Sequence, residues 1–406
     1  MSNFSKVIDY LSTLSSHQRG KIFERYCKWF LENDPRYAIQ LKKVWLWQDW
    51  PENWGRDKGI DLIAETRCGK LWAIQVKAYD EAYYITKEDV DKFISESSRK
   101  EISFRLLIAT TNNLGPNAQE VILAQEKLMG ICLLNQLETS VLDWDCVLTN
   151  SSASYKKKAF VPYPHQERAL LDILAGFKNS DHGQLYMACG TGKTLVGLWL
   201  AERLQSNTTL VLVPSISLVS QLYLEWANNH SNLFNFYPIF VCSDQTVGDK
   251  EENTDYHLDE NINLGFPVTT CSMELLNELS SGAGHKVIFS TYHSSPVIKK
   301  ACEQDASLTF DLVIADEAHR CAGQATSDFA TVVNKDAIRA KHKLFMTATP
   351  KIFSDNVKSK TQEFGYEIAS MDDEEKFGPV FHRLPFSAAI KEKLLSDYQV
   401  VISVMN

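Results

Sequence analysis

The sequence predicts an α/β protein of two domains, of which the second is built on a parallel β-sheet. The chain has 406 residues, which is more than one ordinary domain contains. From Phe160 onward, short apolar runs alternate with helical patterns, as parallel sheets require. Between the two halves, Thr149–Lys158 is polar and then basic, with too few apolar residues to pack. We therefore predict a first domain at residues 1–148, a linker at 149–159 and a second domain at 160–385.

The composition is that of a soluble globular protein, since 44% of the residues are hydrophobic and 23% are charged. The net charge of −9 provides no global basic field, so contact with nucleic acid would depend on local patches or a positively lined cleft. The nine cysteines lack the paired spacing of zinc ligands. The N-terminus has no apolar signal region and no run is long enough to span a membrane, so we expect a cytoplasmic protein.

Six short apolar runs in the second half are predicted to be the strands of the parallel sheet. Each is rich in β-branched or aliphatic residues and is followed by a polar loop. In such sheets the chemistry lies at the carboxyl ends of the strands. The runs are Gln184–Ala188, Leu210–Val213, Phe240–Cys242, Val287–Thr291, Leu312–Ala315 and Lys343–Met346.

A glycine-rich turn follows the first of these strands and precedes a helical pattern. Its sequence is MACGTGKT, at Met187–Thr194, with a methionine where a phosphate loop usually has its first glycine. Such a turn directs backbone N–H groups at phosphate oxygens, and the following helix adds the positive end of its dipole. Lys193 would reach the β- and γ-phosphates, and the Thr194 hydroxyl would ligate Mg²⁺. The predicted phosphate-binding residues are Gly190, Thr191, Gly192, Lys193 and Thr194.

Two acidic residues follow another predicted strand. Asp316 at the strand end could hold Mg²⁺, and Glu317 could orient and deprotonate the attacking water. Alone, the pair is also explained as two acids that stabilise a helix N-terminus. Together with the upstream phosphate loop, it predicts an ATP site.

Further segments occur in the order found in superfamily 2 helicases of the DEAD/DEAH type, and residues 160–385 resemble their first, RecA-like motor domain. The resemblance implies that Gln166 recognises adenine, that His319 joins the ATP site, and that Thr347 and Thr349 couple hydrolysis to strand movement. It also implies that two loops, Pro214–Gln221 and Ser290–Ser294, contact the DNA backbone. The segments are Tyr163–Gln166, Pro214–Gln221, Ser290–Ser294, Asp316–His319 and Thr347–Thr349.

The family's motor has a second lobe that completes the ATP site. Only 22 residues follow Leu384, and we expect residues 386–406, including Asp397–Val401, to be the start of such a lobe. The chain alone is then expected to bind ATP, to hydrolyse it feebly and to unwind nothing.

The first 150 residues contain a second group of polar residues. A strand at Gly59–Ala64, a turn and a second strand at Leu71–Lys77 predict a hairpin. Because side chains alternate along a strand, Asp61, Gln75 and Lys77 are expected on one face. The other face would carry the buried residues Trp72, Ile74 and Val76.

This hairpin has the chemistry of phosphodiester hydrolysis. Asp61 and the Gln75 carbonyl oxygen could hold Mg²⁺, and Lys77 could act on the attacking water or the phosphate charge. The pattern resembles the PD-(D/E)xK nucleases of the Mrr-like branch, in which a first helix contributes a glutamate. Glu24, on a predicted helix at Arg19–Leu31, would correspond. The alternative is a surface hairpin with solvated Gln75 and Lys77.

Other features of this half carry weaker predictions. A helix capped by Thr86 and Asp89 is expected over Thr86–Ser95, and a further strand over Arg105–Thr110. Two groups of aromatic residues are interpreted first as packing, although the tyrosines could stack on bases. They are Tyr79, Tyr83 and Tyr84, and Trp45, Trp47, Trp50 and Trp54.

An Mrr-like nuclease followed by a superfamily 2 motor resembles the N-terminal part of single-polypeptide type I restriction–modification enzymes. The resemblance implies cleavage of double-stranded DNA in defence against foreign DNA, with ATP and Mg²⁺ as cofactors. It also implies a second motor lobe, a methyltransferase and a target-recognition domain as partners, and no membrane. Two alternatives stay open: a regulatory module that binds DNA and ATP without turnover, and a repair helicase with an accessory domain.

Overall fold

The computed structural model describes residues 3–55, 59–149, 160–231, 233–242, 265–281, 284–324, 328–354, 356 and 368–397. Almost all of the predicted linker at 149–159, and residues 398–406 of the predicted second lobe, lie outside the described residues. The chain divides into two compact units. The first comprises Met1–Lys158, Asn235–Thr270 and Asn277–Gly284, and the second comprises Ala159–Phe234, Cys271–Leu276 and His285–Asn406. Within the described ranges, no helix is long and apolar enough to cross a bilayer.

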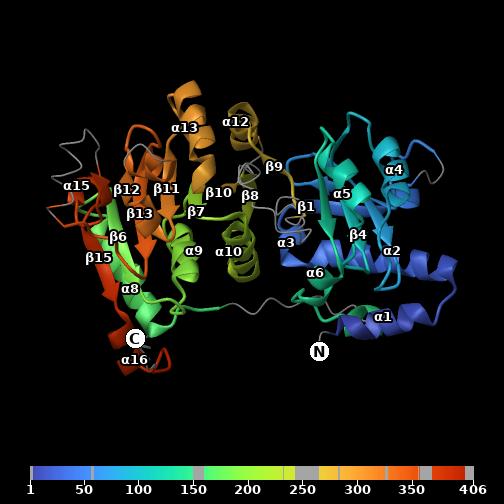
Figure 1. Cartoon of the computed structure of the whole chain (residues 1–406), viewed down its shortest axis with the longest axis horizontal. Helices are drawn as coiled ribbons and strands as arrows, with labels where there is room; N and C mark the ends of the chain where they lie inside the picture. The colour runs from blue at the N-terminus through green and yellow to red at the C-terminus, as the bar shows by residue number, and fades with distance from the viewer. Residues whose placement is uncertain are drawn as a thin grey trace, which may run out of the picture. The chain divides into compact units, whose positions relative to one another are not determined.

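The first unit is built on a five-stranded mixed sheet in the order β1-β2-β3-β4-β5 (Figure 1). The predicted hairpin is confirmed as the antiparallel pair β2–β3, and the predicted strand near Arg105 is β4, which runs parallel to β3. The edge strands β1 and β5 were not predicted from the sequence. The strands are β1 Leu41–Leu46, β2 Leu62–Thr66, β3 Leu71–Lys77, β4 Ile102–Ala109 and β5 Met129–Cys132.

Helices pack against this sheet. The predicted first helix is α2, which buries Phe23, Cys27 and Phe30 along one side. The predicted cap of α4 is also present, because the Asp89 carboxylate accepts the Thr86 backbone N–H at 2.8 Å. The helices are α1 Phe4–Ser12, α2 Ser16–Asn33, α3 Pro35–Ala38, α4 Lys87–Glu96, α5 Pro116–Leu123, α6 Leu134–Glu138 and α7 Asp145–Leu148, with a 3-10 turn η1 at Trp47–Asp49.

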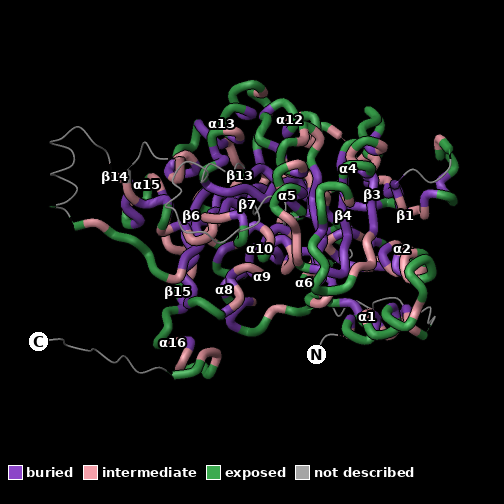
Figure 2. Tube along the Cα trace, turned by 45° about the vertical axis from the view of Figure 1, so that its right-hand side comes forward, coloured by how far each residue is buried: buried purple, intermediate pink, exposed green. Residues whose placement is uncertain are grey.

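Strand β3 is buried on both faces (Figure 2). Trp72 packs against Phe104 on one face, whereas Ala73 on the other joins a core that includes residues of α4 and α5. Gln75 is therefore only 4% exposed, and the alternative of a surface hairpin with a solvated Gln75 is wrong. The reason is that helices far away in the sequence cover the face that the hairpin alone would leave in solvent.

The other sheet has eight strands in the order β15-β6-β13-β11-β7-β10-β8-β9, and its last two strands fall in the first compact unit. All six predicted strands are confirmed, and the neighbours β15–β6–β13–β11–β7–β10 are all parallel. The strands are β6 His182–Met187, β7 Thr208–Val213, β8 Phe236–Val241, β9 Val268–Thr269, β10 His285–Thr291, β11 Phe310–Ala315, β13 Ala340–Thr347 and β15 Val380–Leu384.

Helices and short turns connect these strands (Figure 1). The helices are α8 Pro164–Gly176, α9 Lys193–Arg203, α10 Ile216–Asn229, α12 Ser272–Ser280, α13 Ser295–Gln304, α15 Glu374–Phe377 and α16 Phe386–Lys391. The 3-10 turns are η3 Tyr292–Ser294, η4 Ala318–Cys321 and η5 Asp328–Val333, and β12 Gly323–Gln324 pairs with β14 Ile368–Ala369.

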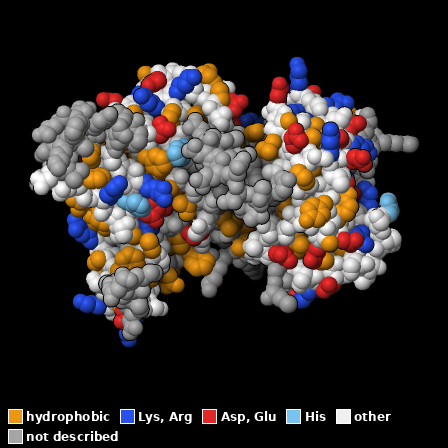
Figure 3. All heavy atoms as spheres, in the orientation of Figure 1, with side chains coloured by type: hydrophobic (Ala, Val, Ile, Leu, Met, Phe, Trp, Pro, Cys, Tyr) orange, Lys and Arg blue, Asp and Glu red, His pale blue; other side chains and the backbone are white. Residues whose placement is uncertain are grey.

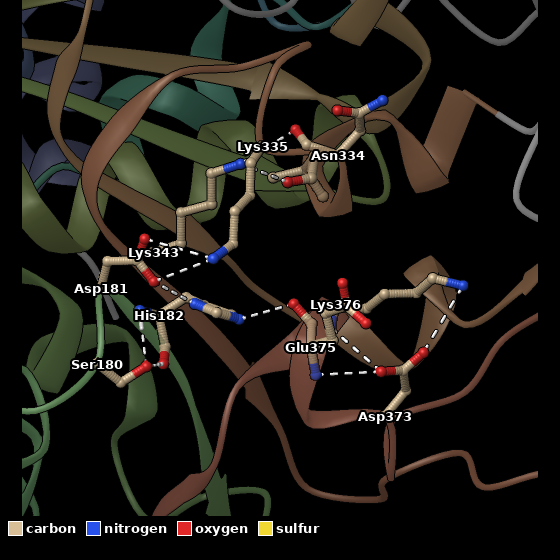
Figure 4. A network of polar contacts seen from close by, with 10 residues as sticks. Ser180, Asp181, His182, Asn334, Lys335, Lys343, Asp373, Glu375 and Lys376 are labelled. Atoms are coloured by element: carbon tan, nitrogen blue, oxygen red, sulfur yellow. Dashed lines mark hydrogen bonds and ion pairs between the residues drawn. The ribbon is translucent and has the colours of Figure 1, made fainter.

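A polar network fastens the amino ends of β6 and β13 (Figure 4). Asp181 pairs with His182 and with Lys335, and the His182 Nε2–H donates to the Glu375 carbonyl at 3.1 Å. Lys343 donates to two backbone carbonyls at 3.0 and 3.2 Å, and burial lowers its pKa to about 8. These contacts hold one end of the sheet, and the predicted chemistry lies at the other end.

Candidate functional sites

The glycine-rich turn joins the end of β6 to the start of α9, as the sequence predicts. Gly190 and Gly192 have φ of +80° and +83°, a region that strongly favours glycine. The Thr191 hydroxyl donates to the Ala188 carbonyl at 2.7 Å and closes the turn. The turn therefore has the compact shape in which backbone amides can surround a phosphate.

Lys193 and Gln166 both pack against this turn. Lys193 is 8% exposed, and its ammonium donates to the Met187 carbonyl at 3.2 Å. The Gln166 carboxamide donates to the Thr191 carbonyl at 3.2 Å and accepts the Tyr163 backbone N–H at 2.9 Å. The structure thus brings the predicted adenine-recognising segment onto the predicted phosphate loop.

Asp316 lies directly after β11, at the same carboxyl end of the sheet as the turn. Burial and the neighbouring charge of Glu317 raise the pKa of the Asp316 carboxyl to about 6, although the Glu317 N–H and the charge of Lys193 act in the opposite direction. Glu317 itself has φ of +50°, in the left-handed region that residues other than glycine rarely adopt. Such strain is typical of functional sites.

His319 connects Glu317 to the end of β13. Its Nδ1 lies 3.4 Å from the Glu317 carboxylate and is hydrogen-bonded to the Thr347 hydroxyl at 3.0 Å. The Thr347 hydroxyl accepts the Thr349 N–H at 3.2 Å. His319, predicted to join the ATP site, and the two predicted coupling residues, Thr347 and Thr349, therefore form one continuous chain of contacts.

Two further residues belong to this site and were missed in the sequence. The buried Tyr292 donates its hydroxyl to the Asp316 carbonyl at 2.7 Å. Burial raises the pKa of Glu225, whose charge also raises that of Asp316. Tyr292 lies in the segment Ser290–Ser294, which the resemblance assigned to the DNA backbone, but the flanking hydroxyls of Ser290, Thr291 and Ser294 are buried.

The first unit contains a cavity of about 620 Å³ at which two of the predicted nuclease residues meet. Glu24 reaches it from α2, and Asp61 reaches it from the residue before β2. Gln75 and Lys77 are not among the residues that line it. The lining residues are Lys21, Glu24, Leu46, Trp47, Gln48, Asn53, Gly55, Ile60 and Asp61.

The backbone around Asp61 is held on both sides. The Asp61 N–H donates to the Ile74 carbonyl at 3.0 Å, and the Asp61 carbonyl accepts the Trp47 N–H at 2.9 Å. The Asp61 carboxylate accepts the Val76 N–H at 2.7 Å. Glu24 forms an ion pair with Lys21 at 3.0 Å. Both carboxylates are thus placed by the sheet and the first long helix.

Gln75 contributes through a buried carboxamide. Its N–H donates to the Gly59 carbonyl at 3.2 Å, whereas no described residue donates to its buried Oε1. Among the described residues, no three His, Cys, Asp or Glu side chains form a metal-binding group. Two carboxylates and an unpaired carboxamide oxygen nevertheless suit a divalent cation that prefers oxygen ligands.

Lys77 lies close to the aromatic residues that follow β3. Its ammonium is 5.9 Å from the centre of the Tyr79 ring. The rings of Tyr79 and Tyr83 are in tilted contact, with centroids 4.2 Å apart, and both hydroxyls donate to Asp89. The interpretation of these rings as packing is confirmed for Tyr79, while Tyr84 is 62% exposed.

Two protein families match the chain in succession. Residues 32–154 match a family of Mrr-type restriction endonucleases. Residues 159–352 match the family described as the res subunit of type III restriction enzymes.

One solved structure is similar to almost the whole chain, and other proteins are similar to part of it. The structure of the ATP-dependent Type ISP restriction–modification enzyme LlaBIII bound to DNA is 31% identical and has a TM-score of 0.79, over 97% of this chain and 26% of LlaBIII. A nuclease-deletion mutant of LlaGI with a DNA substrate mimic is 31% identical over 58% of this chain and 21% of its own, with a TM-score of 0.45. A probable helicase of African swine fever virus is 27% identical over 55% of this chain and 22% of its own. The chain thus spans about a quarter of these proteins.

Proposed function

Because the chain joins an Mrr-type restriction endonuclease domain to the RecA-like motor domain of a restriction-enzyme helicase, we propose that it couples ATP-driven movement on double-stranded DNA to DNA cleavage. The observation that carries this proposal is the similarity to LlaBIII, which extends over 97% of the chain and therefore over both kinds of site. The biological role would be restriction of foreign DNA. We keep residues 1–148 as the nuclease and 160–385 as the motor domain.

In the motor domain, the residues of the turn would hold the phosphates of ATP. Lys193 would transfer its hydrogen bond from the Met187 carbonyl to a phosphate oxygen. Thr194 and Asp316 would hold Mg²⁺, which supplies charge neutralisation when bound. Glu317 would orient the attacking water. His319, which contacts both Glu317 and Thr347, would connect changes in the ATP site to Thr347 and Thr349.

In the nuclease domain, Asp61, Glu24 and the Gln75 oxygen would hold Mg²⁺. The cation supplies polarisation of the phosphate and of a water molecule. Lys77 would orient that water or stabilise the charge of the transition state. The ring of Tyr79, whose centre lies 5.9 Å from the Lys77 ammonium, would help to orient it.

DNA would reach these sites without a global positive field. On the face drawn in Figure 3, Lys and Arg side chains are interspersed with Asp and Glu. Binding would therefore depend on local contacts, as the net charge of −9 suggests. A second motor lobe, a methyltransferase and a target-recognition domain remain proposed partners, supported by the chain's spanning about a quarter of LlaBIII.

The test is cleavage of supercoiled plasmid with Mg²⁺, with and without ATP. Lys77→Ala is expected to reduce nicking by about 100-fold or more, since positioned acid–base groups contribute factors of this order. Lys100→Ala removes an exposed lysine of the same unit and should cut like the wild type.

The outcomes separate the alternatives. Nicking that depends on Lys77 and increases with ATP supports coupled motor and nuclease activities. Equal nicking by the wild type and Lys77→Ala would refute the assigned nuclease site. Binding of DNA and ATP with no cleavage under any condition would favour the regulatory module.

We also expect MgATP binding to weaken as the pH falls through about 6. Burial raises the pKa of the Asp316 carboxyl to about 6 from 3.8. Protonation would therefore remove a magnesium ligand at a pH well above that at which an ordinary aspartate is protonated. Affinity for a fluorescent ATP analogue should be titrated between about pH 5 and pH 8 at two Mg²⁺ concentrations. More Mg²⁺ should move the midpoint to lower pH, because metal and proton compete. Affinity that is constant over this range would contradict the assignment of Asp316.

A further inference from the structure

The cavity at Glu24 and Asp61 is lined by several residues that have no role in the proposed phosphodiester hydrolysis. A metal ion and a phosphate require oxygen ligands and positive charge, which the two carboxylates and Lys21 provide within the lining. The remaining lining residues are of a different kind. They include the apolar residues Leu46, Trp47 and Ile60 and the carboxamide residues Gln48 and Asn53.

We propose that this cavity receives an unstacked nucleobase of the DNA strand being cut, next to the scissile phosphate. The inference rests on the proposed nuclease function and names the part of the substrate that enters its site. A base has flat apolar faces and an edge of hydrogen-bond donors and acceptors, which matches apolar walls and carboxamides. The volume of about 620 Å³ lies in the range of cavities that hold small organic ligands.

The aromatic part of the wall is rigid. Trp47 is 5% exposed, and its indole N–H donates to the Gly55 carbonyl at 3.1 Å. The Trp50 and Trp54 rings contact it, with centroids at 5.8 and 4.9 Å. The sequence interpretation of these tryptophans as packing therefore holds, and the packing also fixes one wall of the cavity. Such a surface can contact a base without first losing side-chain freedom.

The apolar wall and the catalytic carboxylate are connected through the backbone. The Trp47 N–H donates to the Asp61 carbonyl at 2.9 Å, so the two residues are neighbours across β1 and β2. A base against this wall would lie beside the carboxylate that is proposed to bind the metal. This proximity places the base and the phosphate of one nucleotide within the same cavity.

The two carboxamides stand at its mouth. Gln48 and Asn53 are exposed, and the Asn53 amide is anchored by a bond to the Trp50 carbonyl at 2.9 Å. A carboxamide both donates and accepts, so it can pair with the edge of any base. Recognition of this kind would tolerate many sequences. This suits a nuclease whose cleavage position on DNA is determined by the movement of a motor domain.

The test measures whether the base itself is bound. The full chain with Ca²⁺ is mixed with deoxycytidine 5′-monophosphate or with deoxyribose 5-phosphate, which lacks the base. Cytosine is chosen because adenine could enter the second unit. We expect the nucleotide to bind about tenfold more tightly than the sugar phosphate, and saturation-transfer NMR to reach the base protons.

The matched variants assign the effect to the cavity. The double variant Gln48→Ala, Asn53→Ala should lose the tenfold difference, whereas Asn117→Ala, an exposed amide on α5, should keep it. Both replaced side chains are exposed, and an unchanged midpoint of thermal unfolding would verify that the double variant is folded. The two single variants provide a second measurement of the difference in binding. Equal binding of the two ligands by the wild type, or a difference that survives in the double variant, would overturn the inference. The plasmid assay tests the nuclease separately, since nicking that depends on Lys77 supports the nuclease whether or not the cavity discriminates between the two ligands.

Discussion

Asp316→Asn is expected to weaken MgATP binding by about 100-fold or more and, at the same time, to stabilise the protein. The loss follows from removing a proposed metal ligand. The gain follows from burial, which raises the pKa of this carboxyl to about 6 from 3.8 and so makes its charged form unfavourable in the folded state. Two pKa units correspond to about 3 kcal/mol, and we expect roughly 1–2 kcal/mol, because asparagine also loses the attraction of Lys193.

The sign of this effect sets its pH dependence. Because the folded pKa lies above the unfolded value, the carboxylate destabilises the fold above about pH 6, and the penalty disappears as the pH falls toward 4. Urea unfolding without nucleotide should therefore show Asp316→Asn more stable at about pH 8 and equal to the wild type at about pH 4. Asp336→Asn is the matched control, since it makes the same change at an exposed side chain. A variant that is less stable at both pH values would refute the argument.

Gly192→Ala is expected to abolish ATP binding and to destabilise the second unit. The added Cβ would lie 2.2 Å from the Gln166 Nε2, at a φ of +83° that alanine adopts only with strain. The strain alone costs about 1–2 kcal/mol, and the Gln166 carboxamide would have to move away from the turn. The expected result is at least a 100-fold loss of affinity, from about 3 kcal/mol of combined cost.

Two companion variants separate strain from clash. Gly190→Ala has a similar φ of +80°, but its Cβ meets only Leu395, at 3.3 Å. It should lose stability through strain alone. Adding Gln166→Ala to Gly192→Ala should recover the part of stability that is due to the clash. If Gly192→Ala and Gly190→Ala unfold at the same urea concentration, the close contact with Gln166 does not contribute to the loss of stability.

The glycine turn was located correctly from the sequence because its pattern is local. A strand, a glycine turn and a helix are consecutive in sequence, so Gly190–Thr194 could be placed without knowledge of the rest of the fold. The same holds for Asp316 after β11. Tyr292 was missed because its contact with the Asp316 carbonyl joins the ends of β10 and β11, which lie on either side of β7, and because the resemblance assigns its segment to DNA.

The nuclease half was harder because its site depends on distant helices. The hairpin and its alternation were predicted, but the sequence does not show that α4 and α5 pack with Ala73 on the face that also carries the buried Gln75. Strand β15 escaped prediction for a different reason: it is a half-exposed edge strand without a continuous apolar run. The cavity itself depends on Leu46–Gln48 meeting Glu24 and Asp61, which only the fold determines.

The hydrogen bonds within the glycine turn have a consequence for selectivity among anions. Lys193 donates to Met187, and Gln166 and His165 both donate to the Thr191 carbonyl. An incoming anion must break the Lys193 bond before it gains the ammonium. A single phosphate or sulfate would recover little beyond that exchange, whereas a triphosphate gains several amide contacts at once. We therefore expect the turn to discriminate by the number of phosphoryl groups, so that free phosphate released in earlier turnovers would compete poorly with ATP.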